Sequence, residues 1–134
     1  MNEELDYYCG LYLDSSKEES LLISDVARLF HGECERNYIH LNECDISILE
    51  NDDFDEQKRT NPEDGFLFYR YKLEVEPNAE LGEENAIAAV SKLLEFFWSQ
   101  DYPATAACGY EDALPNKGKL IPENYNWGEY YIWK

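Results

Sequence analysis

The sequence predicts an α+β domain, in which two helices cover an antiparallel β-sheet. Two patterns support this prediction. Apolar and polar residues alternate in segments 44–48 and 66–76, as in half-buried strands, whereas apolar residues recur at helical spacing in 22–30 and 87–98. The length of 134 residues is typical of one domain, so we expect 1–134 to fold as a single unit.

The first strand and the first helix are predicted in the N-terminal part of the chain. Residues 7–13 are aromatic and aliphatic, which favours a strand. Ser16 and Glu19 have the spacing of a capping box, in which each side chain satisfies a free amide at the start of a helix. We therefore expect a helix over 17–31, which ends before Gly32.

Two further strands are predicted in the middle of the chain. The region 38–49 contains the alternating residues Cys44, Ile46 and Ile48, and a polar connector follows over 51–65. Segment 66–76 has the clearest strand pattern, with apolar side chains on one face and charged side chains on the other, and it ends before a proline. Its apolar face is expected to comprise Leu67, Tyr69, Tyr71, Leu73 and Val75.

The strongest helix signal covers 83–102. Its apolar residues form one stripe, its first turn is acidic, and Pro103 follows it. Segment 104–110 then predicts a strand of small residues. The aromatic tail 115–134 is expected to form either an extra strand or an arm folded over the sheet.

The predicted order is therefore β-α-β-β-α-β followed by a tail. This order is that of the ferredoxin-like split β-α-β sandwich, an antiparallel sheet with both helices on one face. A barstar-like α/β sandwich is the alternative, because the 32–44 region and the tail are ambiguous in the sequence.

The charge of the chain excludes several kinds of partner. The protein has 29 acidic and 11 basic residues, a net charge of −18, so nucleic acids and anionic membranes would repel it. The acidic N-terminus lacks the features of a signal peptide, and no apolar run has the length needed to span a bilayer. We expect a cytoplasmic protein whose four scattered cysteines are free, buried thiols.

Catalytic, metal-binding and cofactor-binding patterns are missing from the sequence. His31 and His40 are the only histidines and have no zinc spacing with cysteine. The acidic run 50–56 lacks the frame of a calcium loop, and the chain has no glycine-rich phosphate-binding motif. We therefore expect no catalytic residues, no metal and no cofactor.

Acidic clusters and aromatic residues instead indicate an interaction surface. Clustered carboxylates attract a basic partner, and tyrosine and tryptophan are frequent anchors of interfaces. Two alternatives remain open, namely that the charge only confers solubility and that the tail aromatics only cover the sheet. The partner-binding residues that we expect are Asp52, Asp53, Asp55, Glu56, Tyr110, Glu111, Asp112 and Trp127.

In overall character, a small, acidic, aromatic-rich α+β chain resembles the immunity proteins of bacterial toxin systems. The resemblance implies a non-enzymatic protein that binds and inhibits a basic toxin, such as a nuclease, through carboxylates and aromatic side chains. Two other functions remain as alternatives. One is a small-ligand or regulatory binding domain of ferredoxin-like type, which requires a pocket. The other is an enzyme that uses carboxylates, at least one of which would need a strongly raised pKa.

Overall fold

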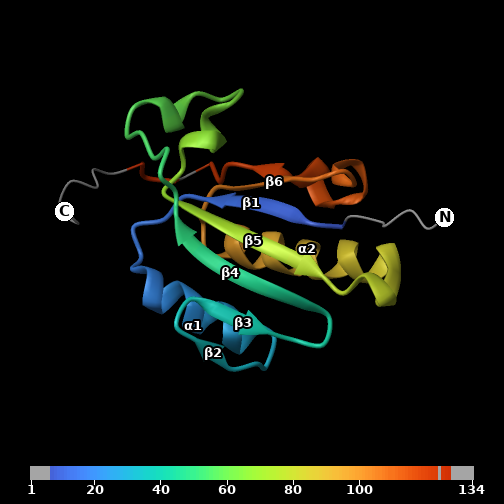
Figure 1. The fold of residues 1–134 in the computed structure, drawn as a ribbon. Coiled ribbons are helices and arrows are strands. Elements are labelled where there is room, and N and C mark those ends of the chain that lie inside the picture. The colour runs from blue at the N-terminus through green and yellow to red at the C-terminus, as the bar shows by residue number, and fades with distance from the viewer. Residues whose placement is uncertain (1–6, 124, 128–134) are drawn as a thin grey trace.

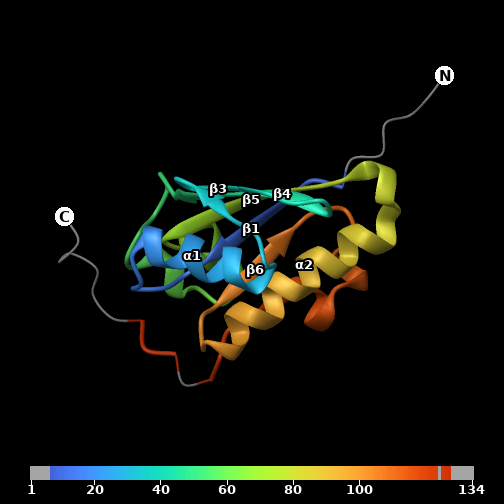
Figure 2. The ribbon, with the colours of Figure 1, turned by 90° about the horizontal axis from the view of Figure 1, so that it is seen from below.

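The computed structural model describes residues 7–123 and 125–127. It contains an antiparallel sheet of seven strands in the order β2-β3-β4-β5-β1-β6-β7, and both helices lie on one face of this sheet (Figures 1 and 2). The α+β prediction is therefore confirmed, although the sheet has more strands than expected. The strands are β1 (Cys9–Leu13), β2 (Cys34–Glu35), β3 (Tyr38–His40), β4 (Cys44–Glu50), β5 (Tyr71–Pro77), β6 (Ala104–Ala107) and β7 (Lys119–Leu120).

The core lies between the sheet and the two helices. In the central strands, Leu11 of β1 is paired with Leu73 of β5 and with Ala106 of β6, and all three side chains are buried. Because side chains alternate between the two faces of a strand, every second residue of β1, β4 and β5 enters this core. The small residues of β6 allow α2 (Gly82–Ser99) to pack closely on the sheet.

The first helix, α1, covers Glu19–Leu29 and is shorter than the expected 17–31. The predicted capping box is wrong, because Glu18 occupies the cap position and its side chain makes no capping hydrogen bond. The hydroxyl of Ser15, not Ser16, accepts a hydrogen bond from the Lys17 amide. The helix ends before Gly32 because His31 turns the chain with a φ of 57°.

The predicted strand 66–76 is correct only from Tyr71 onward. Residues Gly65–Phe68 form a 3₁₀ helix, so Leu67 is exposed and does not belong to the apolar face of the strand. The side-chain amide of Asn51 donates hydrogen bonds to the carbonyls of Leu67 and Tyr69, which replaces strand pairing at these positions. The predicted strand 104–110 and helix 83–102 also end early, at Ala107 and Ser99.

The tail contains both an extra strand and an arm within its described residues. Strand β7 pairs with β6, and the chain then brings Trp127 to the side chain of Arg59 and Tyr125 to that of Asp14. Arg59 and Asp14 form an ion pair of 2.6 Å, in which the two side chains are 1% and 0% exposed. In the part of the chain that the structure describes, no helix is sufficiently long and apolar to cross a bilayer.

Candidate interaction surface

One face of the sheet carries no helix and faces the viewer in Figure 1. Strand alternation sends the residues between the core positions to this side. Across it, the pairs Asp45–Glu76, Ser47–Glu74 and Leu49–Lys72 lie directly opposite one another on β4 and β5. We use the name open face for the outward residues Tyr38, His40, Asp45, Ser47, Leu49, Lys72, Glu74 and Glu76.

Three carboxylates gather on the open face, toward the end at which β4 begins and β5 ends. Asp45 and Glu76 are directly opposite on neighbouring strands, and Glu74 lies two residues from Glu76 on the same side. Like charges in opposite positions of a sheet repel and destabilise it. Asp45 is partly compensated, because its carboxylate lies 2.5 Å from the imidazole Nδ1 of His40. Because these three carboxylates repel one another, a basic partner would stabilise this arrangement.

Apolar side chains flank these carboxylates. Tyr38 is 38% exposed and Leu49 is 36% exposed, so the β3–β4 side of the open face offers aromatic and aliphatic contact area. On the β1 side of the open face, the side chains of Phe66 and Lys72 pack on Tyr12. The ring of Phe66 packs against that of Tyr12 at 5.4 Å between centroids, and the amine of Lys72 lies 5.5 Å from the Tyr12 ring. The region that remains accessible is therefore acidic with an apolar border.

The predicted acidic cluster at 52–56 lies in the loop after β4. Asp52, Asp53 and Glu56 are exposed and available to a partner. Asp55 has a structural role, because its Oδ1 accepts hydrogen bonds of 2.9 Å from the amides of Gln57 and Lys58. These bonds, that from Lys58 above all, hold the pKa of Asp55 below its usual value.

The second predicted cluster, at residues 110–112, lies at the opposite end of the sheet from the 52–56 loop (Figure 1). Strand register explains the separation, since Glu50 precedes that loop and aligns through Tyr71 with Leu13, whereas Ala107 aligns with Gly10. The two clusters therefore lie apart and do not form a single patch of carboxylates.

Within the second cluster, only Asp112 is freely exposed. Tyr110 is buried, and its hydroxyl donates a hydrogen bond of 2.8 Å to the carbonyl of Tyr7, whose ring packs edge-on against it. A carboxylate oxygen of Glu111 accepts a hydrogen bond from the amide of Cys108. Tyr110 and Glu111 thus hold this segment in place.

Trp127 packs inward against the fold. Its ring lies 5.3 Å from the Arg59 guanidinium and 6.0 Å from the Tyr69 ring, and its carbonyl accepts a hydrogen bond from Arg59 Nη2. Asp14 completes this cluster, because one of its carboxylate oxygens accepts hydrogen bonds from Arg59 and from the Tyr125 hydroxyl. The aromatic arm is therefore held by a buried ion pair.

Most surface carboxylates have no cationic neighbour. In the described residues, ion pairs engage only four acids, Asp14, Asp25, Asp45 and Glu50. In the same part of the chain, 18 acidic residues but only five lysines and arginines are exposed. The negative charge is consequently an outward property of the molecule, which attracts cationic groups over a distance.

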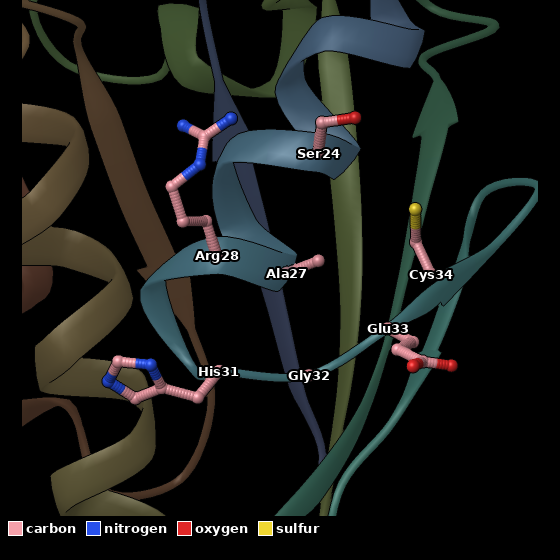
Figure 3. A pocket seen from close by; sticks show the side chains of 7 residues that line it. All are labelled: Ser24, Ala27, Arg28, His31, Gly32, Glu33 and Cys34. Atoms are coloured by element: carbon pink, nitrogen blue, oxygen red, sulfur yellow. The ribbon is translucent and has the colours of Figure 1, made fainter.

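An open groove of about 570 Å³ lies beside the C-terminal end of α1 (Figure 3). Figure 3 shows the His31 imidazole and the Cys34 thiol pointing to opposite sides of the groove, so they do not converge on a common point. No group of three or more histidine, cysteine or acidic side chains suited to a metal ion occurs within residues 7–123 and 125–127. The groove therefore offers no convergent set of ligands.

Sequence reasoning missed two features, the carboxylates of the open face and the buried Asp14–Arg59 pair. Glu74 and Glu76 alternate with apolar residues, which indicates that they lie on one face of their strand. Asp45 stands between the apolar residues Cys44 and Ile46, which indicates that it points away from the core. What the sequence did not reveal is that β4 and β5 are neighbours in this register. The Asp14–Arg59 pair gave no signal, because its members are 45 residues apart.

Comparison with protein-family models, with curated proteins and with solved structures finds no match for this chain.

Proposed function

We propose that this protein is a non-enzymatic inhibitor of a basic protein, of the kind found among the immunity proteins of bacterial toxin systems. The observation that carries the proposal is the open face, where three mutually repelling carboxylates with an apolar border lie on a sheet surface that no helix covers. The excess of exposed carboxylates over exposed basic side chains supports the same conclusion.

The chemistry of such a complex follows from the charges. A toxin that acts on nucleic acid binds phosphate through lysine and arginine, and carboxylates can occupy the same groups. Asp45, Glu74 and Glu76 would form ion pairs with these cations, while Tyr38 and Leu49 would exclude water at the border of the contact. The exposed acids of the 52–56 loop would act earlier, by accelerating the encounter.

We also infer that the four longer strands and two helices form a ferredoxin-like split β-α-β unit. In the order β4-β5-β1-β6, the third long strand along the chain lies between the first and the second, and the fourth lies beyond the first. Both connections that contain a helix lie on the same face of the sheet. Strands β2, β3 and β7 would then be extensions of this unit. Within this proposal, the protein acts in the cytoplasm, where it would meet a toxin before the toxin reaches its substrate.

The experiment that tests the proposed function combines capture with matched charge variants. The tagged protein is incubated with lysate of the source cells at about 50 mM and about 500 mM salt, which screens charges over very different distances. A basic protein retained at low salt is then purified with its activity and titrated with the inhibitor. We expect stoichiometric loss of that activity, whereas retention without inhibition would contradict the proposal.

Two triple variants show which surface is used. The first, D45N/E74Q/E76Q, removes three charges from the open face, and the control, E83Q/E84Q/E95Q, removes three charges from α2 on the other side of the sheet. Both change the net charge from −18 to −15. We expect only the first variant to lose inhibition, and an equal effect of both would refute a specific role for the open face.

A further inference from the structure

Cys9 and Cys108 lie side by side at one end of the sheet. The last residue pair between β1 and β6 is Gly10 with Ala107, so the next position brings Cys9 opposite Cys108. The two thiols are near enough for each to shift the pKa of the other. Cys9 is fully buried in the core, whereas Cys108 is partly exposed to solvent.

The strand register brings these two residues to a separation that suits a covalent bond. Asp14 and Pro103 stand next to the Leu13–Ala104 pair at the other end of the β1–β6 ladder. The amide of Asp14 donates a hydrogen bond to the carbonyl of Pro103, so these two residues form a hydrogen-bonded pair. Hydrogen-bonded and non-hydrogen-bonded pairs alternate along an antiparallel ladder, so the position after Gly10–Ala107 would be a non-hydrogen-bonded one if the ladder continued; β6 ends at Ala107, and Cys108 is the next residue. Opposite residues there have Cα atoms about 4.5 Å apart, which lies within the usual range for a disulfide.

The surroundings of the pair distinguish the two sulfurs. Its proximity to Cys9 and to the Tyr110 amide lowers the pKa of Cys108 to about 7, although partial burial and Glu111 oppose this effect. The pKa of Cys9 is raised by the same contact with Cys108 and by burial. Gly109, next to Cys108, borders open space, so a small reagent can approach Cys108.

We propose that Cys108 and Cys9 form an oxidation site for hydrogen peroxide, in which Cys108 is the attacking thiol and Cys9 is the resolving thiol. The Cys108 thiolate attacks one peroxide oxygen, the O–O bond breaks, and sulfenic acid and hydroxide form. The Cys9 sulfur then attacks the sulfenic sulfur, which forms the disulfide and releases a second hydroxide that takes up the thiol proton as water. Two thiols lose two electrons in total, and peroxide is reduced to water.

The disulfide would fix the N-terminal end of β1 to the segment that follows β6. This segment includes Glu111 and the exposed Asp112, so oxidation would rigidify one acidic end of the molecule. The proposal goes beyond the inhibitor function and does not depend on it, because it concerns residues outside the open face.

The test uses the full chain with Cys34→Ser, which removes the one fully exposed thiol. After treatment with hydrogen peroxide at neutral pH, we expect non-reducing digestion and mass spectrometry to show a Cys9–Cys108 linked peptide. We expect two thiols to be lost per chain and restored by dithiothreitol. In C9S/C34S, dimedone should label Cys108 as the sulfenic acid, and C34S/C44S should still form the disulfide.

Two outcomes would overturn the proposal. The first is that peroxide consumes Cys34 in the wild-type chain while Cys9 and Cys108 both remain reduced. The second is that C34S/C108S loses thiols as fast as C34S, since we expect it to react at least about tenfold more slowly without the activated thiolate. Circular dichroism of each serine variant shows whether its fold is retained, and the dimedone label in C9S/C34S reports on Cys108 without requiring the disulfide.

Discussion

Replacing Arg59 with methionine is expected to destabilise the protein more than any exposed charge removal. The Arg59 side chain is 1% exposed, and it donates one hydrogen bond to Asp14 and one each to the carbonyls of Glu56 and Trp127. R59M would leave the fully buried Asp14 carboxylate without its cation. Removing one member of a buried pair costs about 3 to 5 kcal/mol, a large part of the roughly 5 to 15 kcal/mol that stabilises a domain.

A double-mutant cycle separates the ion pair from the packing of the long arginine chain. In D14N, the amide can still interact with the Arg70 amide and the Tyr125 hydroxyl, which both donate to Asp14 in the native protein. We expect D14N/R59M to lose about 1 to 3 kcal/mol less stability than the sum of the single variants, because the second change removes the uncompensated charge.

The assay is urea unfolding followed by far-ultraviolet circular dichroism, with R28M as the control. Arg28 also pairs with an acid, Asp25, but its side chain is 77% exposed, so its loss should cost less than about 1 kcal/mol. A loss for R59M as small as that for R28M would refute the conclusion that a buried ion pair anchors the C-terminal arm.

Three further predictions concern the loop between β4 and β5 and its glycine. D52N/D53N/E56Q should slow association with the basic partner and flatten the salt dependence of the association rate, because these acids are exposed. An unchanged association rate, measured by stopped flow, would refute their role in the encounter. D55A should lower the thermal unfolding midpoint at pH 7, because the hydrogen bonds from the Lys58 and Gln57 amides, which lower the pKa of Asp55, stabilise the fold at pH values above the ordinary pKa of 3.8. The difference from wild type should close as the pH falls from 3.8 through the folded-state pKa, and a difference that persists at lower pH would contradict this cause. G65A should lower the free energy of unfolding in urea by about 1 to 3 kcal/mol, because a Cβ at this position would lie 2.5 Å from the carbonyl oxygen of Arg59. The control G109A should change it by less than about 0.5 kcal/mol, because Gly109 borders open space. Equal effects of the two variants would show that the close approach at Gly65 is unimportant.

The periodic elements were the predictable part of this fold. Alternation in 44–48 and 71–76 and the apolar stripe of α2 depend on which neighbouring residues share a face, and a single sequence contains this information. The segment 66–70 is included in the predicted strand because Leu67 and Tyr69 continue the apolar face of 71–75, although Phe66 and Phe68 interrupt the alternation. It leaves the sheet because the side chain of Asn51, far away in the sequence, takes up the carbonyls of Leu67 and Tyr69.

The candidate surface was predictable only in its chemistry. The acidity, and with it the proposal of a basic partner, follows from composition, but the residues that share a surface depend on strand order. The clusters at 52–56 and 110–112 lie at opposite ends of the sheet, and Tyr110 is buried. Asp45, Glu74 and Glu76 converge only because β4 and β5 are paired in one particular register.

The central claim is that the carboxylates of the open face bind a basic partner. Its most direct test is a measurement of the affinity of the purified binary complex for wild type, D45N/E74Q/E76Q and E83Q/E84Q/E95Q at several salt concentrations. We expect the open-face variant to bind at least about 100-fold more weakly, since each lost buried ion pair at an interface typically costs at least 1 kcal/mol. We expect the α2 variant to remain within about threefold of wild type, because exposed charges outside a contact contribute little. Equal affinities for wild type and the open-face variant would contradict the account.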